Sequence, residues 1–145
     1  MYMDALLRLS NAQAVTAAAA SESVIDLQSN RDIGTGQDLY LVSVLTVAMT
    51  DGAGNTYPLV VALEGDSTDS FSPDGTQDQY TFPAASPIGT VKYAKLDPGA
   101  APLQFRYIRA KYTPTGGNLT AGSVTTFITT DIQKFKAYAK GYIIS

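Results

Sequence analysis

Residues 39–49 read LYLVSVLTVAM and form the strongest apolar run in the chain. Apolar side chains occupy both sets of alternating positions in this run. Its content of β-branched residues and tyrosine favours a strand over a buried helix. The run therefore predicts a central strand that is buried on both of its faces.

The sequence around this run consists of short apolar stretches separated by turn residues. An Asp-Gly pair follows at 51–52, and the LVVAL at 59–63 predicts the return strand of a hairpin, because glycine supplies the positive φ that hairpin turns need. Further strands are predicted at 24–27, 80–82, 90–93, 103–113 and 122–130, with a polar loop at 65–79. This pattern is typical of an all-β sandwich or barrel.

The chain has 145 residues, which is the length of one ordinary domain. We expect a single domain over 1–145, with an N-terminal arm at 1–12 and a C-terminal tail at 132–145. The tail has spacings that suit either a helix or a strand, and the glycine at 141 favours an extended tail.

Composition excludes several classes of function. The sequence contains no histidine and no cysteine, so it lacks the Ser-His-Asp and Cys-His arrangements and the usual zinc ligands. It carries 10 basic and 13 acidic residues, and this net charge of −3 argues against broad binding to nucleic-acid phosphates. No segment approaches the length of a membrane-spanning run. We therefore expect neither an enzyme nor a cofactor, and no nucleic-acid or membrane partner.

Three local patterns have both a functional and a structural interpretation. Gly34 and Gly36 resemble part of a phosphate-binding loop, but a strand rather than a helix follows them, which favours a turn. Basic and aromatic residues alternate over 103–113, which suits single-stranded nucleic acid, yet strand alternation in an acidic chain favours a mixed outer face. The residues concerned are Phe105, Arg106, Tyr107, Arg109, Lys111 and Tyr112.

The acidic residues of 64–78 form the third pattern. Asp66, Asp69, Asp74 and Asp78 could supply oxygen ligands to Ca²⁺, although their spacing is not that of an EF-hand and a solvated loop explains them as well. Glu64 and Asp66 could form an acid and base pair for hydrolysis, but a solvated strand end is the commoner arrangement.

Four stretches of the sequence resemble the jelly-roll cement (decoration) proteins on the capsids of short-tailed phages. They are DALLRLSNAQAVT at 4–16, SVIDLQSNRDIGTGQDLYLVSVLTVAM at 23–49, PLVVALEGDSTDSFS at 58–72 and FRYIRAKYTPTGGNLTAGSVTTFITTD at 105–131. The resemblance implies a jelly-roll β-sandwich of two antiparallel sheets with extended terminal arms. It also implies a structural protein on the outer surface of the expanded head, made in the bacterial host cytoplasm. Its partners would be the major capsid protein and further copies of itself, as a homodimer or homotrimer that bridges capsomers.

The apolar residues of the arm and the tail are the predicted contacts with the shell or with other subunits. They are Met1, Tyr2, Met3, Leu6 and Leu7 in the arm, and Phe135, Tyr138, Tyr142, Ile143 and Ile144 in the tail. Packing of both segments against the chain's own core is the alternative for these residues. The alternative function is that of a phage adhesin or carbohydrate-binding module, because jelly rolls often carry lectin sites.

Overall fold

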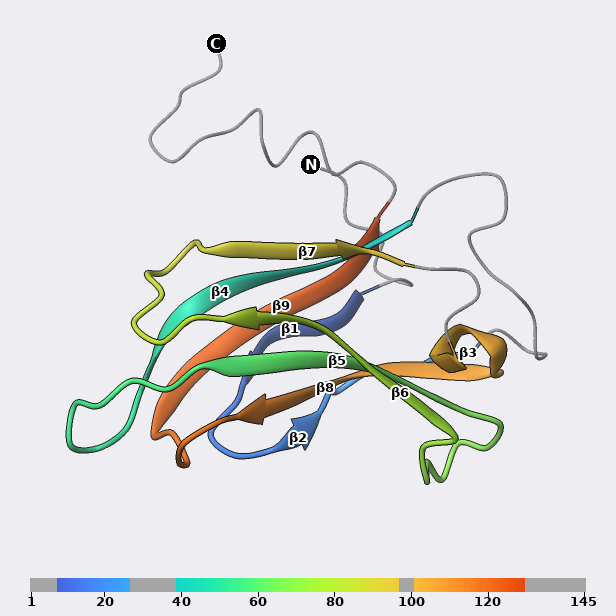
Figure 1. The fold of residues 1–145 in the computed structure, drawn as a ribbon, viewed down its shortest axis with the longest axis horizontal. Helices are drawn as coiled ribbons and strands as arrows, with labels where there is room; N and C mark the ends of the chain where they lie inside the picture. Colours follow the sequence, from blue (N-terminus) through green and yellow to red (C-terminus); the bar gives the residue numbers. More distant parts are fainter. Residues whose placement is uncertain (1–7, 27–38, 97–100, 130–145) are drawn as a thin grey trace, which may run out of the picture.

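A computed structural model of the protein describes residues 8–26, 39–96 and 101–129. These residues form two antiparallel sheets that pack face to face (Figure 1). The first sheet has the strand order β1 (Arg8–Ala14), β9 (Ala121–Thr129), β4 (Tyr40–Thr50) and β7 (Val91–Lys95). The second sheet has the order β2 (Ala19–Ala20), β8 (Tyr107–Pro114), β5 (Leu59–Asp66) and β6 (Gly75–Phe82), and β3 (Ile25–Asp26) also pairs with β8. A short 3-10 helix, η2 (Ala101–Gln104), precedes β8.

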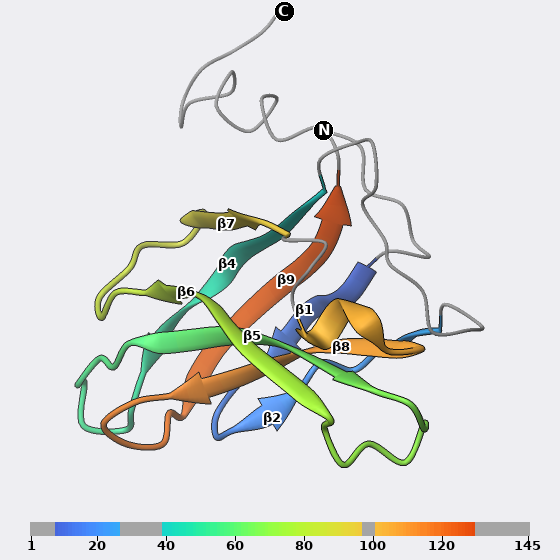
Figure 2. The same ribbon diagram turned by 45° about the vertical axis from the view of Figure 1, so that its right-hand side comes forward.

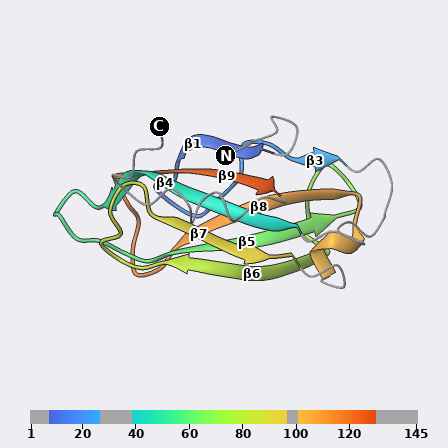
Figure 3. The same cartoon turned by 90° about the horizontal axis from the view of Figure 1, so that it is seen from above.

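The strand pairing is that of a jelly roll. The first half of the chain pairs with the second half in reverse order, β1 with β9, β2 and β3 with β8, β4 with β7, and β5 with β6. Such nested antiparallel pairs, folded over into two sheets, define the jelly-roll sandwich. The order β1, β9, β4, β7 can be followed across the molecule in Figure 3. The all-β sandwich of two antiparallel sheets predicted from the sequence is therefore confirmed.

The run at 39–49 forms β4, a central strand with β9 on one side and β7 on the other. Leu41 and Leu45 point into the space between the sheets, while Val42 and Val44 alternate with them on the outward face. The prediction of a central strand is confirmed, and its apolar residues serve two separate clusters.

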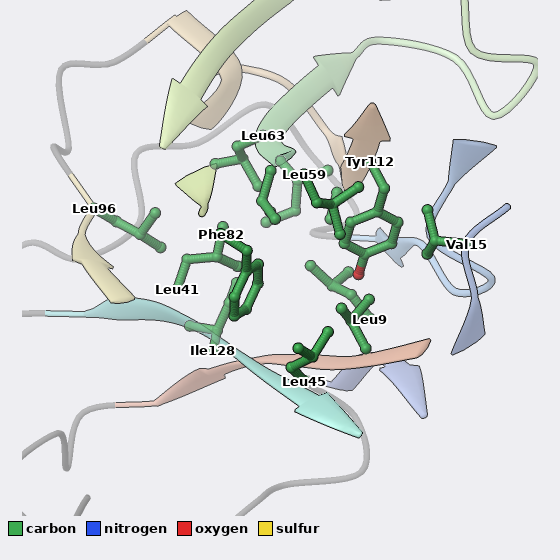
Figure 4. Close-up of a cluster of buried hydrophobic side chains, with 14 of the residues drawn as sticks. Leu9, Val15, Leu41, Leu45, Leu59, Leu63, Phe82, Leu96, Tyr112 and Ile128 are labelled. Atoms are coloured by element: carbon green, nitrogen blue, oxygen red, sulfur yellow. The ribbon is translucent and has the colours of Figure 1, made fainter. Parts of the chain in front are cut away.

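The core lies between the sheets and is built from the inward positions of both (Figure 4). Phe82 of β6 and Tyr112 of β8 are its largest fully buried side chains. Each fully buried aliphatic or aromatic side chain stabilises the fold by about 1.5–3 kcal/mol, so this cluster holds the two sheets together. The labelled members in Figure 4 are Leu9, Val15, Leu41, Leu45, Leu59, Leu63, Phe82, Leu96, Tyr112 and Ile128.

The predicted hairpin around 51–52 is wrong. A turn does form there, because the Asp51 and Asn55 backbones pair at 2.8 Å, but β4 and β5 lie in different sheets. Both strands have an apolar inward face, Leu41 and Leu45 on one and Leu59 and Leu63 on the other. The two apolar faces pack against each other across the core, so the strands lie in opposite sheets and are not neighbours in one sheet.

Three predicted boundaries also change. β6 begins at Gly75, inside the predicted polar loop. It is an edge strand, so its backbone can pair with β5 while its polar side chains stay exposed to solvent. β8 begins at Tyr107 rather than 103, since Pro102 and Leu103 are buried in η2. Residues 8–12 of the predicted arm lie in β1, where β9 pairs with them and buries Leu9.

Candidate functional site

The outward face of the first sheet carries a second hydrophobic cluster, separate from the core. Val42 pairs with Phe127 of β9 on one side and with Tyr93 of β7 on the other. Val42 and Phe127 are fully buried, and half-buried neighbours pack around them. We call this surface the outer apolar face and define it as Tyr40, Val42, Val44, Val47, Val91, Tyr93 and Phe127.

Part of this face is exposed. Val47 is 43% exposed, and it pairs with Ser123, the outward neighbour of the core residue Val124. Tyr93 is 37% exposed and packs edge-on against Tyr40 with their ring centroids 6.4 Å apart. Antiparallel sheets usually present polar side chains on their outward face, so exposed apolar residues here mark a candidate interaction surface.

The loop from β6 to β7 continues the same edge of the sheet. The Gly89 amide donates to the Leu45 carbonyl at 2.8 Å, and Leu45 N donates to the Thr90 carbonyl at 2.9 Å. Ile88, which precedes Gly89, is 59% exposed. Among the residues that the structure describes, three of the four exposed large hydrophobic side chains therefore belong to β4, β7 or the loop beside them. The fourth is Val24.

The outward face of the second sheet is charged and carries two ion pairs. Arg109 Nε donates to Glu64 Oε2 at 2.8 Å, and the Arg109 guanidinium lies 4.0 Å from the centroid of the Phe71 ring. Arg106 donates to both carboxylate oxygens of Asp26, at 2.8 and 3.1 Å. The Asp26 carboxylate holds the pKa of Arg106 above its usual value.

This pairing bears on the basic and aromatic pattern predicted over 103–113. Tyr107, Arg109 and Lys111 do share the outward face, as strand alternation predicted, while the Tyr112 side chain is buried in the core. Arg106 also stacks on Tyr107, 4.9 Å from its ring centroid. Both arginines are thus bound to carboxylates, and the arrangement favours a mixed outer face over a stacking platform for single strands.

The acidic loop after β5 uses its carboxylates as turn acceptors. Thr68 donates to Asp66 Oδ1 from its amide at 2.8 Å and from its hydroxyl at 3.1 Å, and these bonds lower the pKa of Asp66. Asp66 is only 2% exposed, and its Oδ2 has no hydrogen-bond partner among the residues that the structure describes. Asp74 accepts from Ser67. Within 8–26, 39–96 and 101–129, no three acidic side chains are grouped so that they could hold a metal ion.

A chain of five hydroxyl groups crosses the interior from β1 to β6. Tyr112 donates to Thr126 at 2.7 Å, and its oxygen lies 2.7 Å from that of Ser10. Ser43 lies 2.7 Å from Thr126 on one side and 2.7 Å from the Tyr80 hydroxyl on the other. Burial raises the pKa of Tyr112 to about 12 and raises that of Tyr80 further. These hydroxyls satisfy one another where an unpaired one would be costly.

The predicted contact residues cannot be compared with these surfaces. All ten, namely Met1, Tyr2, Met3, Leu6, Leu7, Phe135, Tyr138, Tyr142, Ile143 and Ile144, lie outside the described residues, as do Gly34 and Gly36. The sequence interpretation overlooked the outer apolar face. Its signal was present in the outward valines of 39–49, which were interpreted only as the second buried side of a central strand.

No helix in the part of the chain that the structure describes has the length and apolar character needed to span a membrane. A comparison with known protein families matches residues 9–128 to the family model Bbp16. The matched segment runs from β1 to β9 and so covers almost the whole sandwich. No curated protein matches the chain.

Proposed function

The chain belongs to the Bbp16 family, a phage-associated family, and on that premise we propose that it is a structural virion protein that decorates the capsid. The observation that carries the proposal is the family match, because it spans the sandwich from its first strand almost to the end of its last. In this role the protein is a cement protein. It binds the outside of the expanded phage head and bridges capsomers.

The fold supports this role on physical grounds. Packaged DNA pushes the shell outward, and a binder that touches two or more capsomers gains avidity from its linked sites. If the chain binds only the expanded shell, it stabilises that state by mass action. Such a role needs a rigid scaffold with an adhesive surface, which a jelly roll with an apolar outward face supplies.

The proposal includes partners and a location. The chain binds the major capsid protein and associates with itself as a homodimer or homotrimer, since small capsid binders use closed symmetry. It resides on the outer surface of the virion and is made in the bacterial host cytoplasm. It performs no catalysis and needs no cofactor.

Co-sedimentation with heads that lack the chain tests this function. Purified protein is titrated against matched unexpanded and expanded heads, and the rupture temperature of the heads is measured with and without it. We expect saturable binding to expanded heads only, with a raised rupture temperature. Absence of binding to either form would contradict the proposal, and a glycan array would then test the carbohydrate-binding alternative.

A further inference from the structure

Two side chains at the centre of the outer apolar face are completely buried, although they point away from the core. Val42 and Phe127 are both 0% exposed, whereas Tyr93 in the same row is 37% exposed. Side chains that stand beside a phenylalanine on a sheet leave its outermost atoms open to water, unless a further layer packs on top of them. The complete burial of Phe127 therefore indicates that this part of the face is covered.

The residues around Phe127 lead to the same conclusion. Two adjacent rows cross the face at the end of the sheet where β9 finishes, namely Tyr93–Val42–Phe127 and Lys95–Tyr40–Thr129. Tyr93, Lys95, Phe127 and Thr129 all have interaction partners of their own. The face is thus occupied at this end, while Val47 near the other end of β4 is 43% exposed.

We infer that the cover is the chain's own C-terminal segment, residues 130–145, which packs on the outer apolar face as an additional layer of the sandwich. The segment lies outside the described residues, and the inference rests on the place where the described chain stops. β9 ends at Thr129, two residues beyond Phe127 and opposite Tyr40. Figure 2 shows this end of β9 beside the beginning of β4. The segment therefore starts at the border of the surface that it covers.

The length and composition of residues 130–145 suit this role. Sixteen extended residues span up to about 50 Å, whereas the nine residues of β9 span about 30 Å, so the segment is long enough to return over Val42 and Phe127. Burial of apolar side chains between the segment and the face removes apolar surface of both from water. The large apolar residues of the segment are Ile132, Phe135, Tyr138, Tyr142, Ile143 and Ile144.

The N-terminal arm is a less suitable cover. It precedes Arg8 of β1, and β1 pairs with the far side of β9, so the arm starts one strand farther from Val42 than the C-terminal segment does. The C-terminal segment of a second copy has the same apolar residues, and the experiment distinguishes it from the chain's own.

Introduced cysteine pairs test the contact directly, because the chain has no cysteine. Val44→Cys places one thiol on the outer apolar face, and Phe135→Cys, Tyr138→Cys or Tyr142→Cys places the second in the C-terminal segment. Oxidised glutathione accepts the two electrons as the two thiols form a disulfide and release their protons. Mass spectrometry of the digested protein then identifies links within one chain and links between two chains. A disulfide requires Cα atoms within about 7 Å, so a link reports close contact.

The matched control combines Val60→Cys with the same three cysteines. Val60 is a half-buried outward valine of β5, which lies next to the edge strand β6 as β4 lies next to the edge strand β7. We expect at least one of the three cysteines to link with Val44→Cys within the chain about tenfold faster than with Val60→Cys. Thermal melting under reducing conditions confirms that each variant folds, and three positions in the segment allow for one that does not.

Every outcome decides the inference. Links that form equally fast with Val44→Cys and Val60→Cys, or with neither, would show that the C-terminal segment does not cover the face. Links between two chains would assign the cover to a second copy and overturn the inference. If Leu6→Cys links with Val44→Cys and the cysteines at 135, 138 and 142 do not, the arm is the cover and the inference is wrong. The pure chain is used throughout, so the inference goes beyond the proposed function and is tested without head binding.

Discussion

Asp51 shows how a single carboxylate organises the crossing between the sheets. Its Oδ1 accepts from the amides of Ala53 and Asn55 at 2.9 and 2.7 Å. Its Oδ2 accepts from Asn55 Nδ2 at 2.9 Å and from the Tyr57 hydroxyl at 3.2 Å. The Asn55 side chain is the main cause of a lowered pKa at Asp51, and the same carboxylate raises the pKa of Tyr57.

A pH dependence follows from this lowered pKa. Because folding favours the ionised Asp51, its contribution to stability is present above the unfolded pKa of about 3.9 and is lost as the pH falls through the folded value. We expect Asp51→Asn to be less stable than the parent at neutral pH, with a difference that narrows in acid. Urea unfolding of both chains across this range measures it. Asp78→Asn, at an exposed position of β6, controls for the loss of one negative charge. An Asp51→Asn difference that stays constant with pH would contradict the assignment.

At the scale of elements, the contact between β5 and η2 depends on one missing side chain. A Cβ atom placed on Gly65 would lie 2.2 Å from the carbonyl oxygen of Pro102. That backbone cannot yield without displacing Leu103, which is fully buried in the core. A glycine at this position therefore allows η2 to lie directly on the end of β5.

We expect Gly65→Ala to destabilise the fold by about 1–3 kcal/mol, because overpacking forces backbone shifts. Gly52→Ala is the matched control, since a Cβ there would meet only Thr120 Cγ2 at an ordinary 3.6 Å. That control should change stability by no more than about 0.5 kcal/mol. Denaturant unfolding of the two variants gives the comparison, and equal stabilities would remove the argument for close packing at Gly65.

The elements also show what local sequence pattern can and cannot predict. β4 and β9 were predictable because their alternation and β-branched residues are local properties. The hairpin at 51–52 was wrong, because turn chemistry does not tell whether the next strand pairs with its neighbour or crosses to the other sheet. The outer apolar face was missed for a related reason. It depends on the register that places Val42 between Phe127 and Tyr93, which are far apart in sequence. The predicted contacts in the arm and tail lie outside the described residues and remain predictions.

At the scale of the whole molecule, the outward face of the first sheet is apolar, whereas that of the second carries ion pairs. Inside the sandwich, hydrogen bonds between hydroxyl groups join the two sheets. In this hydroxyl chain, Ser10, Ser43 and Thr126 belong to the first sheet, and Tyr80 and Tyr112 belong to the second. Apolar packing between two sheets is tolerant of small sliding, whereas hydrogen bonds require set distances and angles. The chain of hydroxyls therefore fixes how one sheet lies on the other, and so fixes which strands present the outer apolar face.

Removal of the central hydroxyl tests this role. We expect Tyr112→Phe to cost about 1–2 kcal/mol at neutral pH, because Ser10 and Thr126 each lose a partner in the core. Tyr107→Phe, at a half-buried ring with no hydrogen-bonded hydroxyl among the described residues, should change stability by about 0.5 kcal/mol or less. Denaturant unfolding of the three chains measures both values.

Alkaline pH tests whether the Tyr112 hydroxyl is buried between the two sheets. Folding raises the pKa of Tyr112 from about 10 to about 12, because burial opposes the charged form. Its contribution to stability is therefore complete below the unfolded pKa and is lost as the pH rises through the folded value. Phenylalanine cannot ionise, so the advantage of the parent over Tyr112→Phe should shrink between these two pH values. A difference that is the same at neutral and alkaline pH would mean that the Tyr112 hydroxyl is not buried between the two sheets, which would contradict its place in the hydroxyl chain.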